Sequence, residues 1–90
     1  MEPFDLDASW AVHPQVAVRP EPFGALLYHF GTRRLSCLKD RALTEVVTAL
    51  AAHPTAREAV AAAGIQGAPP AVTTALATLA GTGMITRRSQ

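Results

Sequence analysis

The chain has 90 residues, of which 49% are hydrophobic and 17% are charged, a balance typical of one folded domain with an apolar core. The formal net charge of +1 is unevenly distributed, because the first 22 residues carry −3 and the remainder carries +4. A basic surplus of this size suits an acidic peptide, whereas binders of duplex DNA usually neutralise roughly 6 to 10 phosphates.

The cysteine count and the first residues exclude two further classes of protein. Cys37 is the single cysteine, so no internal disulfide can form, and a secreted domain this small would usually need such cross-links. The start, MEPFDLDASW, lacks the apolar segment of a signal peptide, and no run approaches the roughly 18 to 20 apolar residues of a membrane span. We therefore expect a cytoplasmic protein without a membrane partner.

The first half of the chain carries three strand patterns after an acidic arm over residues 1–13, in which Trp10 is expected to pack on the body. Residues 16–19 alternate, and Pro20 ends that strand because it has no amide donor. The turn PEPFG leads to residues 25–30, which are apolar on both faces like the middle strand of three. After a Gly-Thr turn, residues 34–38 alternate again, and this strand has only one neighbour in a meander.

The second half carries three helical patterns. Asp40 is the expected N-cap of a helix that ends near Ala52, and Thr55 begins a capping box for a short second helix over residues 56–63. The first helix has an apolar stripe at i, i+3, i+4 and i+7, made by Leu43, Val46, Val47 and Leu50. The third helix, Pro69 to Gly83, has no charged side chain, and a short extended segment over residues 84–86 follows. The sequence therefore predicts an α+β fold, a three-stranded antiparallel sheet followed by three helices.

No set of residues has the pattern of an active site. Cys37 lacks a base held by an orienting acid, although His29 lies on the neighbouring strand. The three histidines, His13, His29 and His53, lie on different elements without metal-ligand spacing, and no phosphate-binding glycine loop occurs. We expect a non-catalytic protein without cofactor or metal.

Nucleic-acid binding through a winged helix-turn-helix is the alternative function. The third helix argues against it, because base and phosphate contacts need Arg, Lys, Asn or Gln, and this helix offers only Ala, Thr, Val, Leu, Gly and Pro. The basic residues elsewhere that could coat a phosphate backbone are Arg33, Arg34, Lys39, Arg41, Arg87 and Arg88.

Peptide binding by strand addition fits the open strand edge and the uncharged helix better. The expected peptide-binding residues are Arg34, Leu35, Ser36, Cys37, Leu38 and Lys39 on the strand and Thr73, Ala77 and Ala80 on one flank of the helix. Three alternatives remain. The helix flank could pack on the acidic arm, the basic residues around the strand could be a solvated face, and two copies could pair through the same edge, giving a monomer or weak homodimer.

The segment WAVHPQVAVRPEPFGALLYHFGTRRLSCLK, Trp10 to Lys39, resembles the start of the mycofactocin biosynthesis chaperones, relatives of the PqqD peptide chaperone in the RiPP recognition element class. The likeness extends to about Arg88 and is most specific over HPQVAVRPEPFGALLYHFG. It implies a PqqD-like peptide-binding domain over residues 14–90, winged helix-turn-helix-like in fold. It also implies that the leader of the mycofactocin precursor peptide binds as a strand between Arg34–Lys39 and the flank of Pro69–Gly83. The precursor would then be presented to a radical SAM maturase, which supplies the iron–sulfur clusters.

Overall fold

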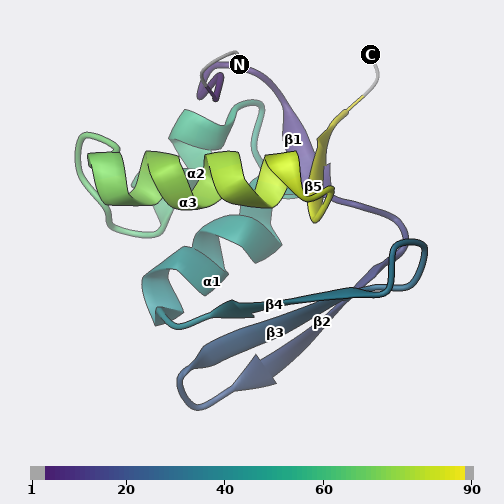
Figure 1. Ribbon diagram of the computed structural model, residues 1–90. Coiled ribbons are helices and arrows are strands. Elements are labelled where there is room, and N and C mark those ends of the chain that lie inside the picture. Colours follow the sequence, from purple (N-terminus) through teal and green to yellow (C-terminus); the bar gives the residue numbers. More distant parts are fainter. Residues whose placement is uncertain (1–3, 89–90) are drawn as a thin grey trace.

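The computed structural model describes residues 4–88. Within these residues, three helices, one 3-10 turn and five strands follow one another (Figure 1). The strands are β1 (Trp10–Val12), β2 (Val16–Glu21), β3 (Gly24–His29), β4 (Arg34–Leu38) and β5 (Ile85–Arg87). The helical elements are α1 (Arg41–Ala49), η1 (Leu50–Ala52), α2 (Ala56–Ala62) and α3 (Pro70–Gly81). The predicted α+β fold with a three-stranded antiparallel sheet and three helices is confirmed.

The main sheet has the strand order β2-β3-β4, with antiparallel pairing at both interfaces. Gly24 begins β3 with a φ of +152°, and a Cβ at this position would lie 2.0 Å from the carbonyl oxygen of Leu38. Only glycine fits this close approach between the start of β3 and the end of β4. The other turn, between β3 and β4, is held by buried His29, whose Nδ1 accepts hydrogen bonds from the backbone N–H groups of Gly31 (3.0 Å) and Thr32 (3.1 Å).

The core extends from one face of the sheet through α1 to α2, α3 and the β1–β5 pair. Ala25, Leu27 and Leu38 are buried on that face, and the predicted apolar stripe of α1 meets them, with Val46 and Val47 fully buried. Figure 1 shows α1 directly above the sheet, with α2 and α3 stacked beyond it. The hydrophobic stripe predicted from helical spacing is thus confirmed, because it is the side of α1 that the sheet covers.

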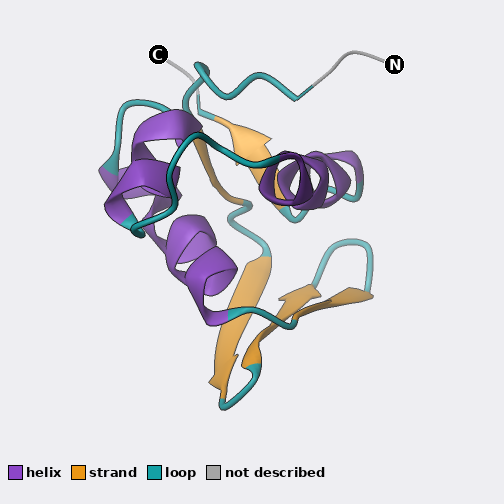
Figure 2. Cartoon of the chain, turned by 90° about the vertical axis from the view of Figure 1, so that its left-hand side faces the viewer, coloured by secondary structure: helices purple, strands orange, loops and turns teal. Residues whose placement is uncertain are grey.

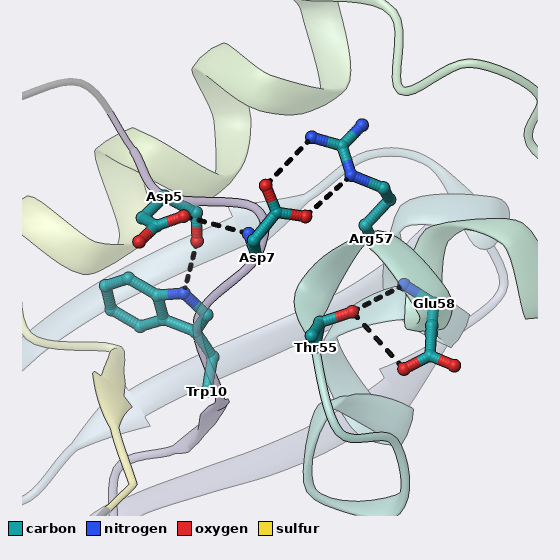
Figure 3. Close-up of polar contacts among 6 residues, drawn as sticks. All are labelled: Asp5, Asp7, Trp10, Thr55, Arg57 and Glu58. Atoms are coloured by element: carbon teal, nitrogen blue, oxygen red, sulfur yellow. Dashed lines mark hydrogen bonds and ion pairs between the residues drawn. The ribbon is translucent and has the colours of Figure 1, made fainter.

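The helix starts are those that the capping residues predict. The Asp40 carboxylate accepts a hydrogen bond from the backbone N–H of Leu43 at 3.1 Å, which satisfies one of the unpaired donors in the first turn of α1. The hydroxyl oxygen of Thr55 accepts from the N–H of Glu58 at 3.2 Å in the same way (Figure 3). Both N-caps are confirmed, and with them the starts of the first two helices. The α-helix itself ends at Ala49, earlier than predicted, and the 3-10 turn η1 continues to Ala52.

The main departure from the sequence prediction is β1, which lies inside the segment expected to be an acidic arm. Residues 10–12 pair antiparallel with β5, so the extended segment expected after the third helix finds its partner at the other end of the chain. Trp10 is only 9% exposed, and its indole N–H donates to the carbonyl of Asp5 at 2.9 Å (Figure 3). The expectation that Trp10 packs on the body is confirmed, while residues 1–3 of the arm lie outside the described residues.

An ion pair joins the same segment to α2. The guanidinium Nε of Arg57 lies 2.9 Å from the carboxylate of Asp7 (Figure 3). This hydrogen bond, together with the charge of Arg57, lowers the pKa of Asp7 from its ordinary value. Both side chains are solvent-exposed, so the pair adds orientation to the segment rather than much stability.

Candidate functional site

The outer edge of β4 is open. The order β2-β3-β4 gives β4 a single strand neighbour, β3, within residues 4–88. The N-terminal segment does not cover this edge, because its strand β1 pairs with β5 instead. A row of backbone N–H and C=O groups on β4 is therefore available to a further strand.

The register decides which residues of β4 present those groups. The N–H of Phe30 donates to the carbonyl of Gln15 at 2.7 Å, in line with the β2–β3 register, so Phe30 directs its backbone polar groups toward β2. Direction alternates along an antiparallel strand, and Leu27 therefore directs its groups toward β4, where its partner is Ser36. It follows that Ser36 is engaged with β3, whereas Leu35 and Cys37 point their N–H and C=O groups outward.

The opposite edge of the sheet differs from β4 in one important respect. Pro20 was expected to end this strand, but β2 continues to Glu21 and Pro20 pairs with Ala25. Proline is accommodated here because, by the same alternation, its backbone nitrogen points away from β3. Proline has no N–H, so this edge lacks a donor where a guest strand would need one. The two edges are therefore not equivalent, and β4 is the better template.

The side chains of the predicted strand residues divide between the two faces of the sheet. Leu38 is buried and Ser36 half-buried on the core face, because their partners are the core residues Ala25 and Leu27. Leu35, which is 63% exposed, and Cys37 lie on the outer face. Arg34 and Lys39, at the two ends of the strand, are exposed.

Positive charge surrounds β4 at both ends. Arg33 precedes β4 and Arg34 begins it. Lys39 and Arg41 follow the strand, and all four side chains are exposed. Within the part of the chain that the structure describes, the ion pairs are Arg19–Glu21 and Arg57–Asp7, so none of these four residues pairs with a carboxylate. Their charge is left available to an acidic partner.

The predicted helix residues share one flank of α3. Thr73, Ala77 and Ala80 are half-buried, beside the buried Leu76 and Leu79. In Figure 2, α3 is seen nearly end-on above the sheet, on the opposite side from α1 and α2. α3 packs mainly on β5, whereas β4 packs on β3 and α1. The predicted strand residues and the predicted helix residues therefore do not pack extensively against each other.

A pocket of about 300 Å³ lies elsewhere, between α1 and α2. Its lining residues are Glu45, Ala49, His53, Ala59, Ala62 and Ala63. None of them was predicted to bind a ligand, and the sequence gives no signal for it, because alanines on two helix faces are ordinary packing residues.

The only pair of residues considered for catalysis is separated by the sheet. His29 is buried on the core face with its Nδ1 occupied by two backbone donors, whereas Cys37 lies on the outer face. Among the described residues, no cluster of three or more His, Cys, Asp or Glu side chains could hold a metal ion. No helix in residues 4–88 is both long and apolar enough to cross a bilayer.

Comparison with known proteins identifies close relatives. A family model described as the peptide chaperone MftB family matches residues 9–86. Peptide chaperone MftB from Mycolicibacterium smegmatis is 69% identical over 62 residues, which cover 69% of this chain and 61% of that protein. The proteins of the same name from Mycobacterium ulcerans and Mycobacterium tuberculosis are 57% identical over 83 residues and 54% identical over 86 residues. These alignments cover 91% and 94% of this chain, and 76% and 79% of the two relatives.

No solved structure matches the chain, so the assignment depends on sequence. The family model spans most of the chain, including all three strands of the main sheet and all three helices. The resemblance noted from residues 10–39 is confirmed. The chain belongs to the peptide chaperone MftB family, a family of non-catalytic proteins.

Proposed function

We propose that the protein binds the leader of the mycofactocin precursor peptide as an additional strand on β4 and presents the precursor to a radical SAM maturase. The family supports a peptide partner, since the relatives are named peptide chaperones. The observation that carries the binding mode is the open edge of β4.

Strand addition suits a chaperone because main-chain hydrogen bonds supply affinity, and alternate side chains supply specificity. Leu35 and Cys37 each offer one N–H and one C=O to the guest, from a strand that β3 and α1 already hold in place. The guest therefore pairs with a preformed template, and only the peptide has to become ordered.

The charges around β4 favour an acidic leader. Arg33 and Arg34 at one end and Lys39 and Arg41 at the other have no carboxylate partner within residues 4–88. Each exposed ion pair with the guest is worth about 0.2–1 kcal/mol, so these residues guide and orient the leader while the backbone pairing provides most of the affinity.

The flank of α3 is proposed to receive side chains from the inward-facing side of the guest strand. A guest residue opposite Ser36 projects onto the same face of the sheet as Ser36, which is the face that looks toward the helices. Thr73, Ala77 and Ala80 are small, and α3 carries no charge, so a large apolar guest side chain could pack there.

The proposal assigns the chemistry to the maturase, because the family to which this chain belongs is non-catalytic. The maturase brings its iron–sulfur clusters and performs the reaction, while the chaperone holds the leader in an extended form. We place this complex in the cytoplasm. The free protein is expected to be a monomer or a weak homodimer that pairs through β4, and the leader should displace the second copy from that edge.

The test is a titration of ¹⁵N-labelled protein with a synthetic leader of the mycofactocin precursor. The largest shifts are expected at the amides of residues 34–39 and on the flank of α3. The amide of Val18, which points outward from the β2 edge, serves as an internal control and should move little. Shifts confined to α2 or to residues after β5 would refute the proposed site.

A further inference from the structure

The outer face of the main sheet carries exposed apolar side chains next to the open edge. Phe30 is 61% exposed, Leu35 is 63% exposed and Tyr28 is 37% exposed. Tyr28 lies directly opposite Leu35 in the register, and its ring meets that of Phe30 edge-on with centroids 5.2 Å apart. The sequence prediction of a middle strand that is apolar on both faces is confirmed, but only one of those faces is covered.

Of these residues, Leu35 lies on β4, where the guest strand is proposed to bind, and Tyr28 is its partner on the central strand. On the same outer face, β2 presents Ala17, Arg19 and Glu21, and the last two form an ion pair at 3.0 Å. The outer face therefore carries an ion pair and one small side chain on β2, but Leu35 and Cys37 on β4. This asymmetry favours an occupant that arrives at β4.

The alternation of the strand connects this apolar surface to the guest. Residues directly opposite one another in neighbouring strands project onto the same face of a sheet. Leu35 and Cys37 present both the outward amides and the outer-face side chains. Guest residues paired with them must therefore project onto the outer face, two positions apart, in contact with Leu35 and Cys37.

We propose that the outer face of β4, formed by Leu35 and Cys37 and extended by Tyr28, is a specificity surface for apolar side chains at positions i and i+2 of the guest strand. The inference rests on the proposed function, because it needs the guest on β4. It goes beyond that function by assigning a second contact surface, on the face of the sheet opposite α3.

A double-mutant cycle tests this surface. Leu35→Ala keeps the amide and should weaken binding of the leader peptide by about two- to fivefold, the size expected for one cross-strand pair. Each apolar leader residue is also replaced by alanine. At one of these positions, Leu35→Ala should then have no further effect, and a second sensitive position should lie two residues away, next to Cys37.

Phe23→Ala is the matched control, since Phe23 is 45% exposed but lies in the turn between β2 and β3. It should leave the affinity unchanged. Leu35→Thr should reproduce the loss of affinity. Because threonine favours extended backbone, this result would show that the loss does not come from a weakened strand.

The outcomes separate this inference from the proposed function. If the amides of β4 shift with the leader but Leu35→Ala acts independently at every leader position, the outer surface is refuted and strand addition stands. If β4 does not respond to the leader at all, both are refuted. If Leu35→Ala changes self-association in sedimentation and leaves the leader affinity unchanged, the surface takes a second copy and the inference is wrong.

Discussion

Proline substitutions at neighbouring positions of β4 have opposite expected consequences. The N–H of Cys37 points outward and that of Ser36 points toward Leu27, as the alternation of the β2–β3 and β3–β4 registers requires. Cys37→Pro therefore removes a donor that only a guest strand uses. The unpaired guest carbonyl costs about 1–2 kcal/mol, which is about 5- to 30-fold in affinity for the leader peptide.

Ser36→Pro removes a donor that β3 already uses. The unpaired carbonyl inside the sheet should lower the free energy of unfolding by about 1–3 kcal/mol. Proline is tolerated on an edge strand when its nitrogen faces away from the sheet, so Cys37→Pro should change the melting temperature much less than Ser36→Pro.

The assay combines isothermal titration calorimetry with thermal unfolding followed by circular dichroism. Cys37→Ala, which keeps the amide, is the control and should weaken binding by at most about threefold, because only one small cross-strand contact is lost. Equal affinity of Cys37→Pro and Cys37→Ala would refute strand addition. A normal melting temperature for Ser36→Pro would refute the alternation from which the outward residues were derived.

Three further substitutions probe the fold that holds the site in place. Trp10→Ala should lower the free energy of unfolding in urea by about 3 kcal/mol, because the buried indole is lost; a change within error would show that β1 is dispensable. The lowered pKa of Asp7 means that its exposed pairing with Arg57 makes a small contribution to stability above about pH 4, and this contribution is lost as pH falls through the lowered pKa. Asp7→Asn should therefore reduce the acid-dependent loss of stability, and an unchanged pH profile would contradict the assignment. Gly24→Ala should cost about 1–3 kcal/mol and also weaken leader binding, since its Cβ would displace Leu38 at the end of β4; native stability and affinity together would contradict this.

The main sheet and the helix starts could be predicted because each depends on local sequence. Asp40 and Thr55 cap helices through their own side chains. The prediction that Pro20 ends the first strand is wrong, because β2 continues through Pro20 to Glu21. By contrast, β1 was missed. Residues 10–12 form a strand only because β5, more than 70 residues later, supplies its partner, and a three-residue segment carries no alternation of useful length.

The candidate site could be predicted as a strand but not in its details. Leu35 and Cys37 alternate with Arg34 and Ser36, which shows that two faces exist but does not show which one the helices cover. The covered face is the one that carries Ser36 and Leu38, because their partners on β3, Leu27 and Ala25, are buried beneath the helices. The direction of each amide likewise follows from pairing across two strand interfaces, which no single segment encodes.

Hydrogen exchange of individual β4 amides tests strand addition most directly. In the free protein, the Leu35 and Cys37 amides should exchange quickly and the Ser36 amide slowly, because only Ser36 is paired with β3. At saturating leader peptide, Leu35 and Cys37 should become protected while Ser36 changes little. Unchanged exchange at both Leu35 and Cys37 in the saturated complex would contradict the account.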